Sequence, residues 1–420
     1  MTFIHKIAAI IRPRAVGIND DLPLSSGDKK KSKRINLLYG SVQSMYLAGI
    51  CSFHTFLVLY LKDNNYSEFQ IGLIMTLMSV IGVFSPTIIG YIADYHIPIK
   101  MIVVVLITIS IPLAFMVQAA VAFYPIALAM ILMTGIAEKG MGSVIDSWGM
   151  RLRNKHPYLN YGATRGLASL SYAIMALIAG RIYESFGLDK MFVVHAVVAA
   201  LCVIFAMMLD NVPVSKKSKD SKSFFSTVRQ LLYIRQYSIL LVVMVMHGFS
   251  MVVIGTFQPI LISDHGGTSV HLGISSFVLA ASEVPVMYNS AKFLRRFRVE
   301  SLLIVSLFFA ATRLLLSVLA PSLGWLIAAQ SLQALSFGLY LPSLLFYISL
   351  ITPDEMQSTA ITLALSVGFG VSGIIGNFFG GILAQNFGVD SVYYLFSFLA
   401  ACGLILFRLT RKTSIPRPAE

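Results

Sequence analysis

Charged residues are scarce in this sequence of 420 residues. Asp, Glu, Lys and Arg together make up 12% of the chain, whereas 57% of the residues are hydrophobic. The mean hydropathy is +0.79. A soluble globular protein of this length needs more polar surface than this composition supplies. The sequence therefore excludes a soluble globular protein and indicates one with many membrane-spanning helices.

Cysteines and soluble catalytic motifs are also scarce. The three cysteines, Cys51, Cys202 and Cys402, lie far apart inside apolar runs, a pattern that favours packing roles over disulfides or metal ligation. No Gly-rich phosphate loop or Ser-His-Asp constellation appears in a polar segment, and no such segment is long enough for an ATPase domain. We therefore expect no enzymatic activity, no metal and no cofactor, with a proton gradient as the energy source.

Apolar runs of about 20 residues predict twelve membrane-spanning helices. The predicted spans are 35–61, 69–93, 101–120, 123–150, 162–186, 191–209, 237–262, 272–294, 302–320, 323–351, 360–387 and 393–407. The resulting domain prediction is an N-terminal tail (1–34), a six-helix bundle (35–209), a linker (210–236), a second six-helix bundle (237–407) and a C-terminal tail (408–420).

An internal repeat supports two similar halves. The segment from Gly180 to Asp189 aligns with the segment from Gly381 to Asp390 at an offset of 201 residues, and Gln70-Ile71-Gly72 falls on His271-Leu272-Gly273 at the same offset. Six spans return the chain to the same side of the membrane, so the two bundles are expected to share one orientation and to form a site near mid-membrane.

The net charge of +13 is concentrated in alternate loops. This is the asymmetry expected when basic residues stay in the cytoplasm. We expect a multi-pass protein of the cell membrane with both termini cytoplasmic, in contact with lipid and not with nucleic acid. A monomer is expected. The basic groups of the cytoplasmic side are Lys29 to Arg34, Arg151 to Lys155, Lys216 to Arg235, Lys292 to Arg298 and Arg408 to Arg417.

The stretch between predicted spans four and five carries two charges inside apolar runs. Asp146 lies near the end of one run, and Arg165 lies near the start of the next. At similar depth on neighbouring helices, the carboxylate and the guanidinium are expected to face each other, because either one unpaired in the membrane is costly. Intramembrane charges usually mark a substrate or ion pathway. A purely structural clamp between two helices is the alternative.

The second span ends in Gly90-Tyr-Ile-Ala-Asp94, which resembles a loop motif of the major facilitator superfamily of secondary transporters. The resemblance implies twelve helices in two pseudo-symmetric six-helix bundles, an all-α membrane fold, and a gate motif at Gly90 and Asp94. The basic residues that usually follow are poorly kept in Tyr95 to Lys100. We therefore expect this gate to be weaker or differently paired, or Asp94 to be an ordinary loop acid.

Within that superfamily the chain is most similar to the lactose permease group and the related phenylpropionate and nucleoside permeases. Tyr161-Gly162-Ala-Thr-Arg165 resembles the group's Phe-Gly-x-x-Arg, and Asp146 stands where the group has a substrate-contacting carboxylate. Tyr172 takes the place of an aromatic residue that stacks on a sugar ring, although an ordinary core role suits it equally. The resemblance implies that Asp146, Arg165 and Tyr172 bind substrate.

The second half extends the resemblance and then departs from it. Glu283 and Arg313 stand where the lactose permease group has a binding carboxylate and a coupling arginine. Both are expected to contribute to substrate binding, either as a pair across neighbouring helices or as a pair that opens when a proton or ligand arrives. The tenth span, however, has Gln333, Ser336 and their neighbours where the group has titratable residues. The group's proton mechanism therefore cannot simply be carried over.

Glu138 is a carboxylate that the resemblance does not predict. It lies eight residues before Asp146, roughly 12 Å along a continuous helix. Burial favours the protonated form of a carboxyl group, which a proton carrier requires. We take Glu138, Asp146 and Glu283 as candidates for proton coupling, with neutralisation of Glu138 by Lys139 as the alternative. His54, His195 and His247 lie on three different spans and are expected to be satisfied interior residues.

These observations predict a secondary transporter that takes up a small polar organic solute together with protons by alternating access. The expected substrate classes are a sugar or glycoside, a nucleoside, or a small aromatic acid, in that order. Two other interpretations remain open at this stage. One is proton-coupled efflux of amphipathic compounds, and the other is a membrane sensor that has the fold but does not transport.

Overall fold

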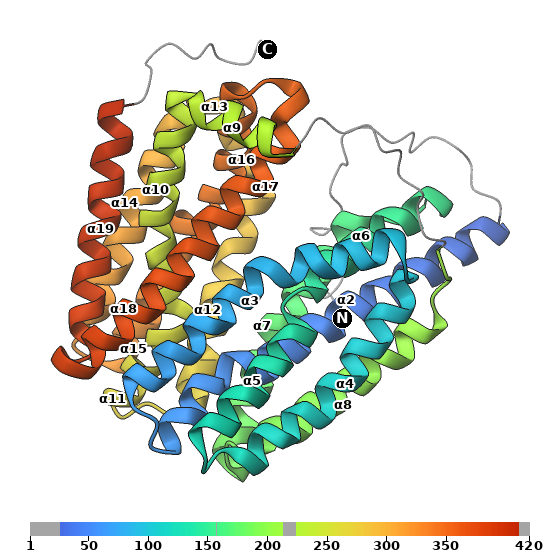
Figure 1. The fold of residues 1–420 in the computed structure, drawn as a ribbon, viewed down its shortest axis with the longest axis horizontal. Helices are drawn as coiled ribbons and strands as arrows, with labels where there is room; N and C mark the ends of the chain where they lie inside the picture. The colour runs from blue at the N-terminus through green and yellow to red at the C-terminus, as the bar shows by residue number, and fades with distance from the viewer. Residues whose placement is uncertain (1–25, 157, 213–223, 411–420) are drawn as a thin grey trace, which may run out of the picture. The chain divides into compact units, whose positions relative to one another are not determined.

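The computed structural model describes residues 26–156, 158–212 and 224–410, and within these ranges every regular element is helical (Figure 1). The α-helices of the first half are α2 (Ser26–Asp63), α3 (Glu68–Tyr95), α4 (Ile99–Ala120), α5 (Tyr124–Glu138), α6 (Met141–Lys155), α7 (Tyr161–Phe186) and α8 (Lys190–Met208). Those that follow are α9 (Phe224–Tyr233), α10 (Arg235–Val252), α11 (Gln258–Asp264), α12 (Ser269–Tyr288), α13 (Ser290–Arg296), α14 (Val299–Val318), α15 (Leu323–Ala329), α16 (Tyr340–Ile351), α17 (Gln357–Leu365), α18 (Ser372–Phe387) and α19 (Val389–Thr410).

Short helical turns of other types interrupt the second half. They include the π-helical segments η1 (Val253–Phe257), η3 (Ala334–Gly338) and η5 (Ser366–Val371), and the 3₁₀ segments η2 (Gln330–Leu332) and η4 (Asp354–Met356). The π-helical segments fall within the seventh, tenth and eleventh spans. Such bulges leave backbone groups outside the regular ladder, and they are frequent at functional sites.

Twelve helical spans in the described part of the chain are long and apolar enough to cross a membrane. They agree with the twelve predicted spans to within a few residues, so the predicted all-α membrane fold is confirmed. The apolar runs form helices because a helix satisfies its own backbone hydrogen bonds where no water is available. We number these spans one to twelve in chain order.

The predicted tails and linker differ in part from the structure. Helix α2 begins at Ser26, within the predicted N-terminal tail, and α19 continues to Thr410. Helix α9 lies within the predicted linker. Residues 1–25, 213–223 and 411–420 of these segments, among them Lys216 to Lys222, lie outside the described residues.

The chain divides into two compact units. The first holds the described parts of Met1–His54, Phe84–Ala179 and Asp189–Lys217, and the second holds those of Thr55–Val83, Gly180–Leu188 and Ser218–Glu420. Their borders fall inside α2, α3 and α7, because one end of each of these helices packs with helices of the second unit. The predicted division into bundles at 35–209 and 237–407 stays a prediction.

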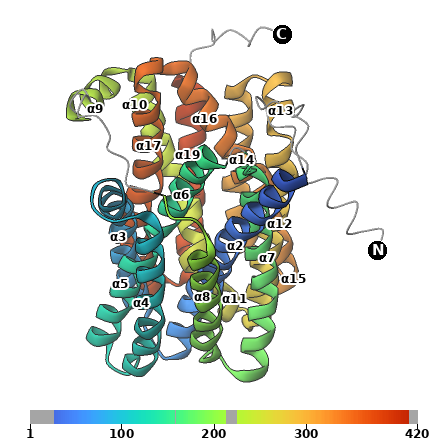
Figure 2. The same cartoon turned by 90° about the vertical axis from the view of Figure 1, so that its right-hand side faces the viewer.

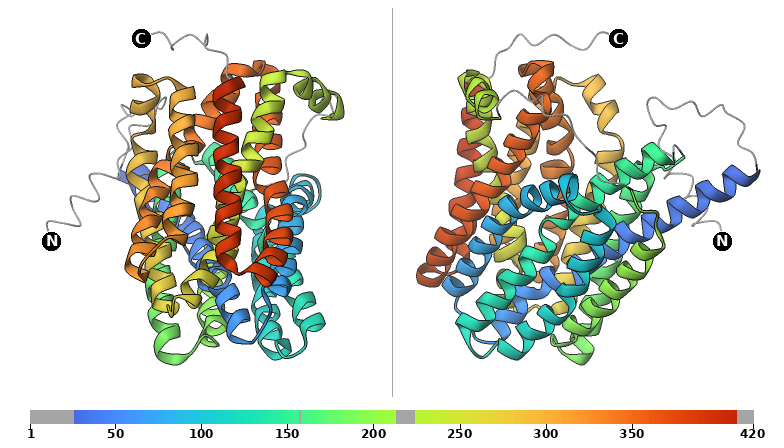
Figure 3. Two further views of the ribbon diagram at one scale, coloured as in Figure 1. Left: turned by 90° about the vertical axis from the view of Figure 1, so that its left-hand side faces the viewer. Right: turned by 45° about the vertical axis from the view of Figure 1, so that its right-hand side comes forward.

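Each unit has its own hydrophobic core. In the first unit, α4 packs against α5 and α8 (Figure 2), and the buried core includes Trp148 and Tyr39. In the second unit, α19, drawn in red in Figure 3, packs along α10 and α14. The core there includes Tyr237, Tyr347 and Phe407.

The sequence repeat has a structural counterpart at two helix ends. Gly187 follows α7 with a φ of 90°, and Gly388 follows α18 with a φ of 82°. Residues with a side chain rarely adopt this left-handed conformation, whereas glycine does so at little cost. The two glycines stand at equivalent positions of the repeat, so both halves end the corresponding helix in the same way.

Span four is broken in its middle. Helix α5 ends at Glu138 and α6 begins at Met141, with Lys139 and Gly140 forming the turn between them. The Tyr46 hydroxyl donates a hydrogen bond of 3.2 Å to the main-chain carbonyl of Glu138, which satisfies an acceptor at the break. The continuous helix assumed between Glu138 and Asp146 is therefore wrong.

We predict that Gly140→Ala destabilises the protein by about 1–3 kcal/mol through overpacking. A Cβ at this position would lie 2.7 Å from Ile89 Cδ1, 2.8 Å from Ser85 Oγ and 3.1 Å from the Ser85 carbonyl carbon. The measurement is the free energy of unfolding of the purified protein. Gly166→Ala is the control, because a Cβ there meets no atom within 4 Å. Equal effects of the two substitutions would contradict this packing argument.

Candidate functional site

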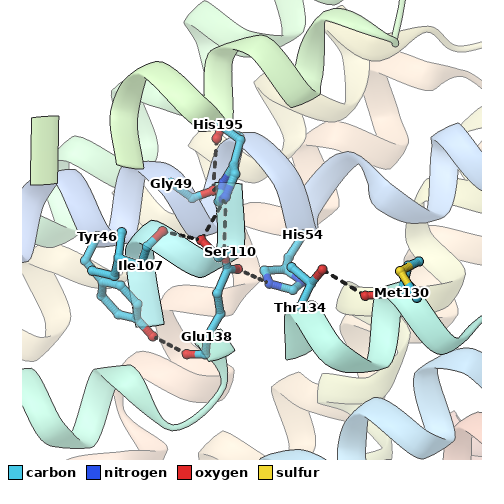
Figure 4. A network of polar contacts seen from close by, with 10 residues as sticks. Tyr46, Gly49, His54, Ile107, Ser110, Met130, Thr134, Glu138 and His195 are labelled. Atoms are coloured by element: carbon cyan, nitrogen blue, oxygen red, sulfur yellow. Dashed lines mark hydrogen bonds and ion pairs between the residues drawn. The ribbon is translucent and has the colours of Figure 1, made fainter. Parts of the chain in front are cut away.

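Glu138 lies between two histidines in the interior of the first unit (Figure 4). Its Oε2 is 2.7 Å from His54 Nε2, and its Oε1 is 3.1 Å from His195 Nε2. Glu138 and His195 are 4% and 3% exposed. The carboxylate at the end of α5 thus joins span four to span one through His54 and to span six through His195.

The surroundings of this cluster are polar on one side and apolar on the other. His195 Nδ1 is 3.4 Å from the Gly49 carbonyl oxygen, and Ser110 Oγ lies 3.5 Å from His195 Nε2. A cavity of about 20 Å³ borders Glu138, His195 and Ser110, and its other lining residues include Tyr46 and Cys202. This volume is on the scale of a single water molecule.

Sequence reasoning identified Glu138 as a candidate and missed its partners. His54 and His195 are satisfied interior histidines, as expected, and the partner they share is the Glu138 carboxylate, which the sequence did not indicate. Lys139 makes no ion pair within 4.0 Å in the described structure, but it interacts electrostatically with Glu138. Its neutralisation of Glu138 therefore stays an alternative. The only sequence feature that pointed to this cluster was that two histidines and one acid lie inside apolar runs.

Asp146 belongs to a second polar group in the first unit. Gln43 Nε2 of α2 donates a hydrogen bond of 3.1 Å to Asp146 Oδ1, and the Tyr161 hydroxyl lies close enough to interact with this carboxylate. Tyr39 lies beside them and donates its hydroxyl proton to the Ile145 carbonyl at 3.0 Å. Gln43 Oε1 is buried and has no partner among the described atoms.

The predicted contact between Asp146 and Arg165 is not formed in this conformation. Within the described residues no ion pair of 4.0 Å or less joins them, and the Arg165 side chain is exposed while Asp146 is half-buried. Tyr172 lies two helical turns after Arg165 on α7 and is half-buried. The structure therefore brings Asp146 together with Gln43 and Tyr161 and leaves Arg165 open to a ligand or to solvent.

In the second unit, Arg313 is held by neutral groups. It is 1% exposed, and its two terminal nitrogens donate to Gln330 Oε1 at 3.0 Å and to the Ser250 carbonyl at 2.8 Å. No carboxylate lies within 4.0 Å of the guanidinium in the described chain, so the expected pair with Glu283 is absent. Glu283 instead lies close enough to Gln333 for their side chains to interact.

Span ten therefore supplies amides where the resemblance led us to look for titratable groups. Gln330 holds Arg313, and Gln333 contacts Glu283 and accepts a hydrogen bond of 3.0 Å from Ser336. His247 lies against Tyr340, with ring centroids 3.9 Å apart and the ring planes tilted by 36°. Neither of its ring nitrogens has a hydrogen-bond partner in the described structure, so the expectation of a satisfied histidine is wrong there.

The gate motif is paired inside the first unit. The Asp94 carboxylate at the end of α3 forms an ion pair with Arg151 of α6, which also contacts the Ala93 carbonyl at 3.5 Å. Gly90 lies one turn earlier, and a Cβ there would meet no atom within 4 Å. The acid is thus paired with span four, and no basic residue of Tyr95 to Lys100 pairs with it among the described ion pairs.

A family model described as the MFS_1 like family matches residues 40–395. The chain belongs to this family. Its membership of the major facilitator superfamily, predicted from Gly90 to Asp94 and from the two halves, is thereby confirmed, and the protein is a transporter and not an enzyme. The narrower likeness to the lactose permease group stays a prediction.

Two relatives can be aligned with this chain over most of its length. It is 26% identical over 359 residues to the maltose permease of Geobacillus stearothermophilus. This alignment covers 85% of this chain and 89% of the permease. It is 24% identical over 375 residues to the uncharacterized transporter YwbF of Bacillus subtilis, covering 87% and 91% of the two chains.

Solved structures of low identity share the fold. A crystal structure of the nucleoside transporter NupG matches with a TM-score of 0.80 at 16% identity, covering 90% of this chain and all of that one. The D-xylose-proton symporter matches with a TM-score of 0.66 at 12% identity, covering 92% and 98%. The predicted major facilitator fold is therefore confirmed.

We predict that Arg313→Leu lowers the free energy of unfolding by about 1–3 kcal/mol. The substitution leaves the Gln330 and Ser250 oxygens without their donor, and buried unsatisfied acceptors are costly. Arg295→Leu is the control, because Arg295 is exposed and such changes stay within about 0.5 kcal/mol. A gain in stability from Arg313→Leu would show instead that the burial of its charge outweighs the two hydrogen bonds.

Proposed function

We propose that this protein takes up a small polar organic solute together with protons by alternating access. The observation that carries the proposal is the Glu138 carboxylate, which is almost fully buried in span four and contacted by histidines of spans one and six. Ionisable groups inside a membrane protein are expensive and usually mark substrate, ion or proton pathways. Glu138 is the favoured coupling group, with Asp146 and Glu283 as the other candidates.

The proposed solute contacts follow from the chemistry of the Asp146 group. Asp146 offers a hydrogen-bond acceptor, Arg165 offers several donors, and Tyr172 offers an aromatic face. Hydroxyl-rich rings suit such a combination, so we propose a sugar or glycoside first, then a nucleoside, then a small aromatic acid. The names of the maltose permease, the nucleoside transporter and the D-xylose-proton symporter are in keeping with this order.

The second unit is proposed to contribute Glu283 and Arg313 to solute binding. Arg313 has no carboxylate partner within 4.0 Å in the described structure, and its Nε has no hydrogen-bond acceptor. Solute binding would supply acceptors for such donors. Protons and solute would then bias the protein between two arrangements, with Gly90 and Asp94 in the gate. We place the protein in the cell membrane as a monomer, with both termini in the cytoplasm.

The first experiment records external pH in a lightly buffered suspension of de-energised cells that express the protein. Maltose, a nucleoside and phenylpropionate are added in turn. Alkalinisation with one solute, absent for Arg165→Ala, would support proton symport and identify the solute class. Uptake of a labelled solute without any pH change would contradict the coupling to protons.

We predict that Glu138→Gln abolishes uphill accumulation of the solute found in that experiment but keeps solute exchange between internal and external pools. Exchange does not require net proton release, whereas accumulation does. The readouts are concentrative uptake and counterflow in the same membrane vesicles. Asp189→Asn, an exposed acid changed to its amide, is the control and should keep both activities. Full accumulation by Glu138→Gln would assign coupling to another group, and Glu283→Gln would be measured next.

A further inference from the structure

The two ring nitrogens of His195 both face hydrogen-bond acceptors. Nδ1 is 3.4 Å from the Gly49 carbonyl oxygen, which can only accept a hydrogen bond. Nε2 is 3.1 Å from Oε1 of the Glu138 carboxylate. A neutral imidazole has one N–H and one lone pair, so it cannot donate in both directions. Ser110 Oγ also lies 3.5 Å from Nε2, but it donates its proton to the Ile107 carbonyl at 2.9 Å. A neutral ring that donates from Nδ1 would then direct its Nε2 lone pair at the Glu138 oxygen, so one additional proton is needed between Nε2 and Oε1.

The position of His54 decides which group holds that proton. His54 Nε2 approaches the other carboxylate oxygen at 2.7 Å, the length of a charge-assisted hydrogen bond from an N–H to an ionised carboxylate. One ring proton on His54 suffices for this contact. With Glu138 ionised and accepting from both sides, the additional proton lies on His195 as an imidazolium.

We infer that His195 holds one transferable proton as the partner of Glu138, and that its loss releases span six from the Gly49 carbonyl of span one. This inference rests on the proposed proton coupling and names the residue that carries the proton. A neutral His195 keeps the 3.1 Å contact to Glu138 through Nε2–H, because this contact is the shorter one and its acceptor is charged. Nδ1 then presents a lone pair to the Gly49 oxygen, and the 3.4 Å contact becomes repulsive.

The groups packed around the pair are consistent with this assignment. A proton on His195 makes Glu138 and His195 together neutral, which lowers the cost of their burial. Lys139 is a further cation that interacts electrostatically with both His54 and Glu138. The titratable groups that face the pair from the neighbouring elements are Tyr46 and His54 of α2, Lys139 of the turn after α5, and Cys202 of α8, with Ser110 of α4 as a neutral neighbour.

The cavity beside the pair offers the proton a short route. It borders Glu138, His195 and Ser110 and has room for about one water molecule. A water there can take the proton when Nδ1 releases it. Proton release and the separation of two helices therefore share one imidazole ring (Figure 4).

The test is nitrogen NMR of the full-length protein labelled with ¹⁵N-histidine and held in lipid nanodiscs, with no solute present. The His195 signals are those lost in His195→Gln. At neutral pH both ring nitrogens of His195 should carry protons. As the pH is raised, Nδ1 should lose its proton while Nε2 keeps its own. His195 that is singly protonated at every pH at which the protein stays folded would overturn the inference, and so would loss of the Nε2 proton first.

A second variant keeps the test decisive if His195→Gln does not fold. Glu138→Gln removes the charged acceptor, so the signals of one histidine should change from doubly to singly protonated at neutral pH. His96→Gln is the control, because His96 is exposed and its substitution should leave those signals unchanged. No histidine changing in Glu138→Gln would also overturn the inference. Since no solute is used, this outcome is separate from the symport experiment, in which a lack of alkalinisation would count against the proposed function alone.

Discussion

A charge that is removed from water must be neutralised by groups inside the protein, and this requirement determines how the first unit is assembled. Glu138 meets it with one histidine from span one and another from span six. The three spans are distant in the sequence, and their apolar surfaces alone would tolerate many rotations about each helix axis. The hydrogen bond from His54 and the ion pair with His195 favour one rotation for each span.

The second unit satisfies the same requirement in another way. Arg313 is surrounded by an amide oxygen and a main-chain carbonyl, so dipoles replace a counter-ion. Ser250 lies in α10, three residues before the π-helical segment η1 begins and the regular helical ladder is disturbed. The amide comes from the short 3₁₀ turn η2 in span ten. Irregular helical segments thus lie beside the two acceptors of Arg313, the Ser250 carbonyl and the Gln330 amide oxygen, inside the membrane-spanning region.

Much of the fold could be predicted from the sequence. The spans were predictable because the length of an apolar run is a local property of the sequence. The repeat was predictable because Gly187 and Gly388 both end a helix with a positive φ at equivalent positions. The break after Glu138 was not, since it depends on the contact of Gly140 with Ser85 and Ile89 of another helix.

The candidate site was predictable only in part, for a related reason. Residue type and depth identified Glu138, Asp146 and Arg313, because ionisable groups in apolar runs are conspicuous. Their partners depend on how the helices are rotated against one another, which no spacing along the chain specifies. Gln43 and His195 therefore became visible as partners only in the folded protein.

The break in span four has a mechanical consequence. Glu138 ends α5, and Asp146 belongs to α6, so a two-residue joint at Lys139 and Gly140 separates the two carboxylates. A rigid rod would transmit every rotation of one carboxylate to the other. With a turn between them, α5 and α6 can change their orientations separately at Lys139 and Gly140. Gly140 is the small residue of this turn. Its close packing against α3 fixes the position of the turn.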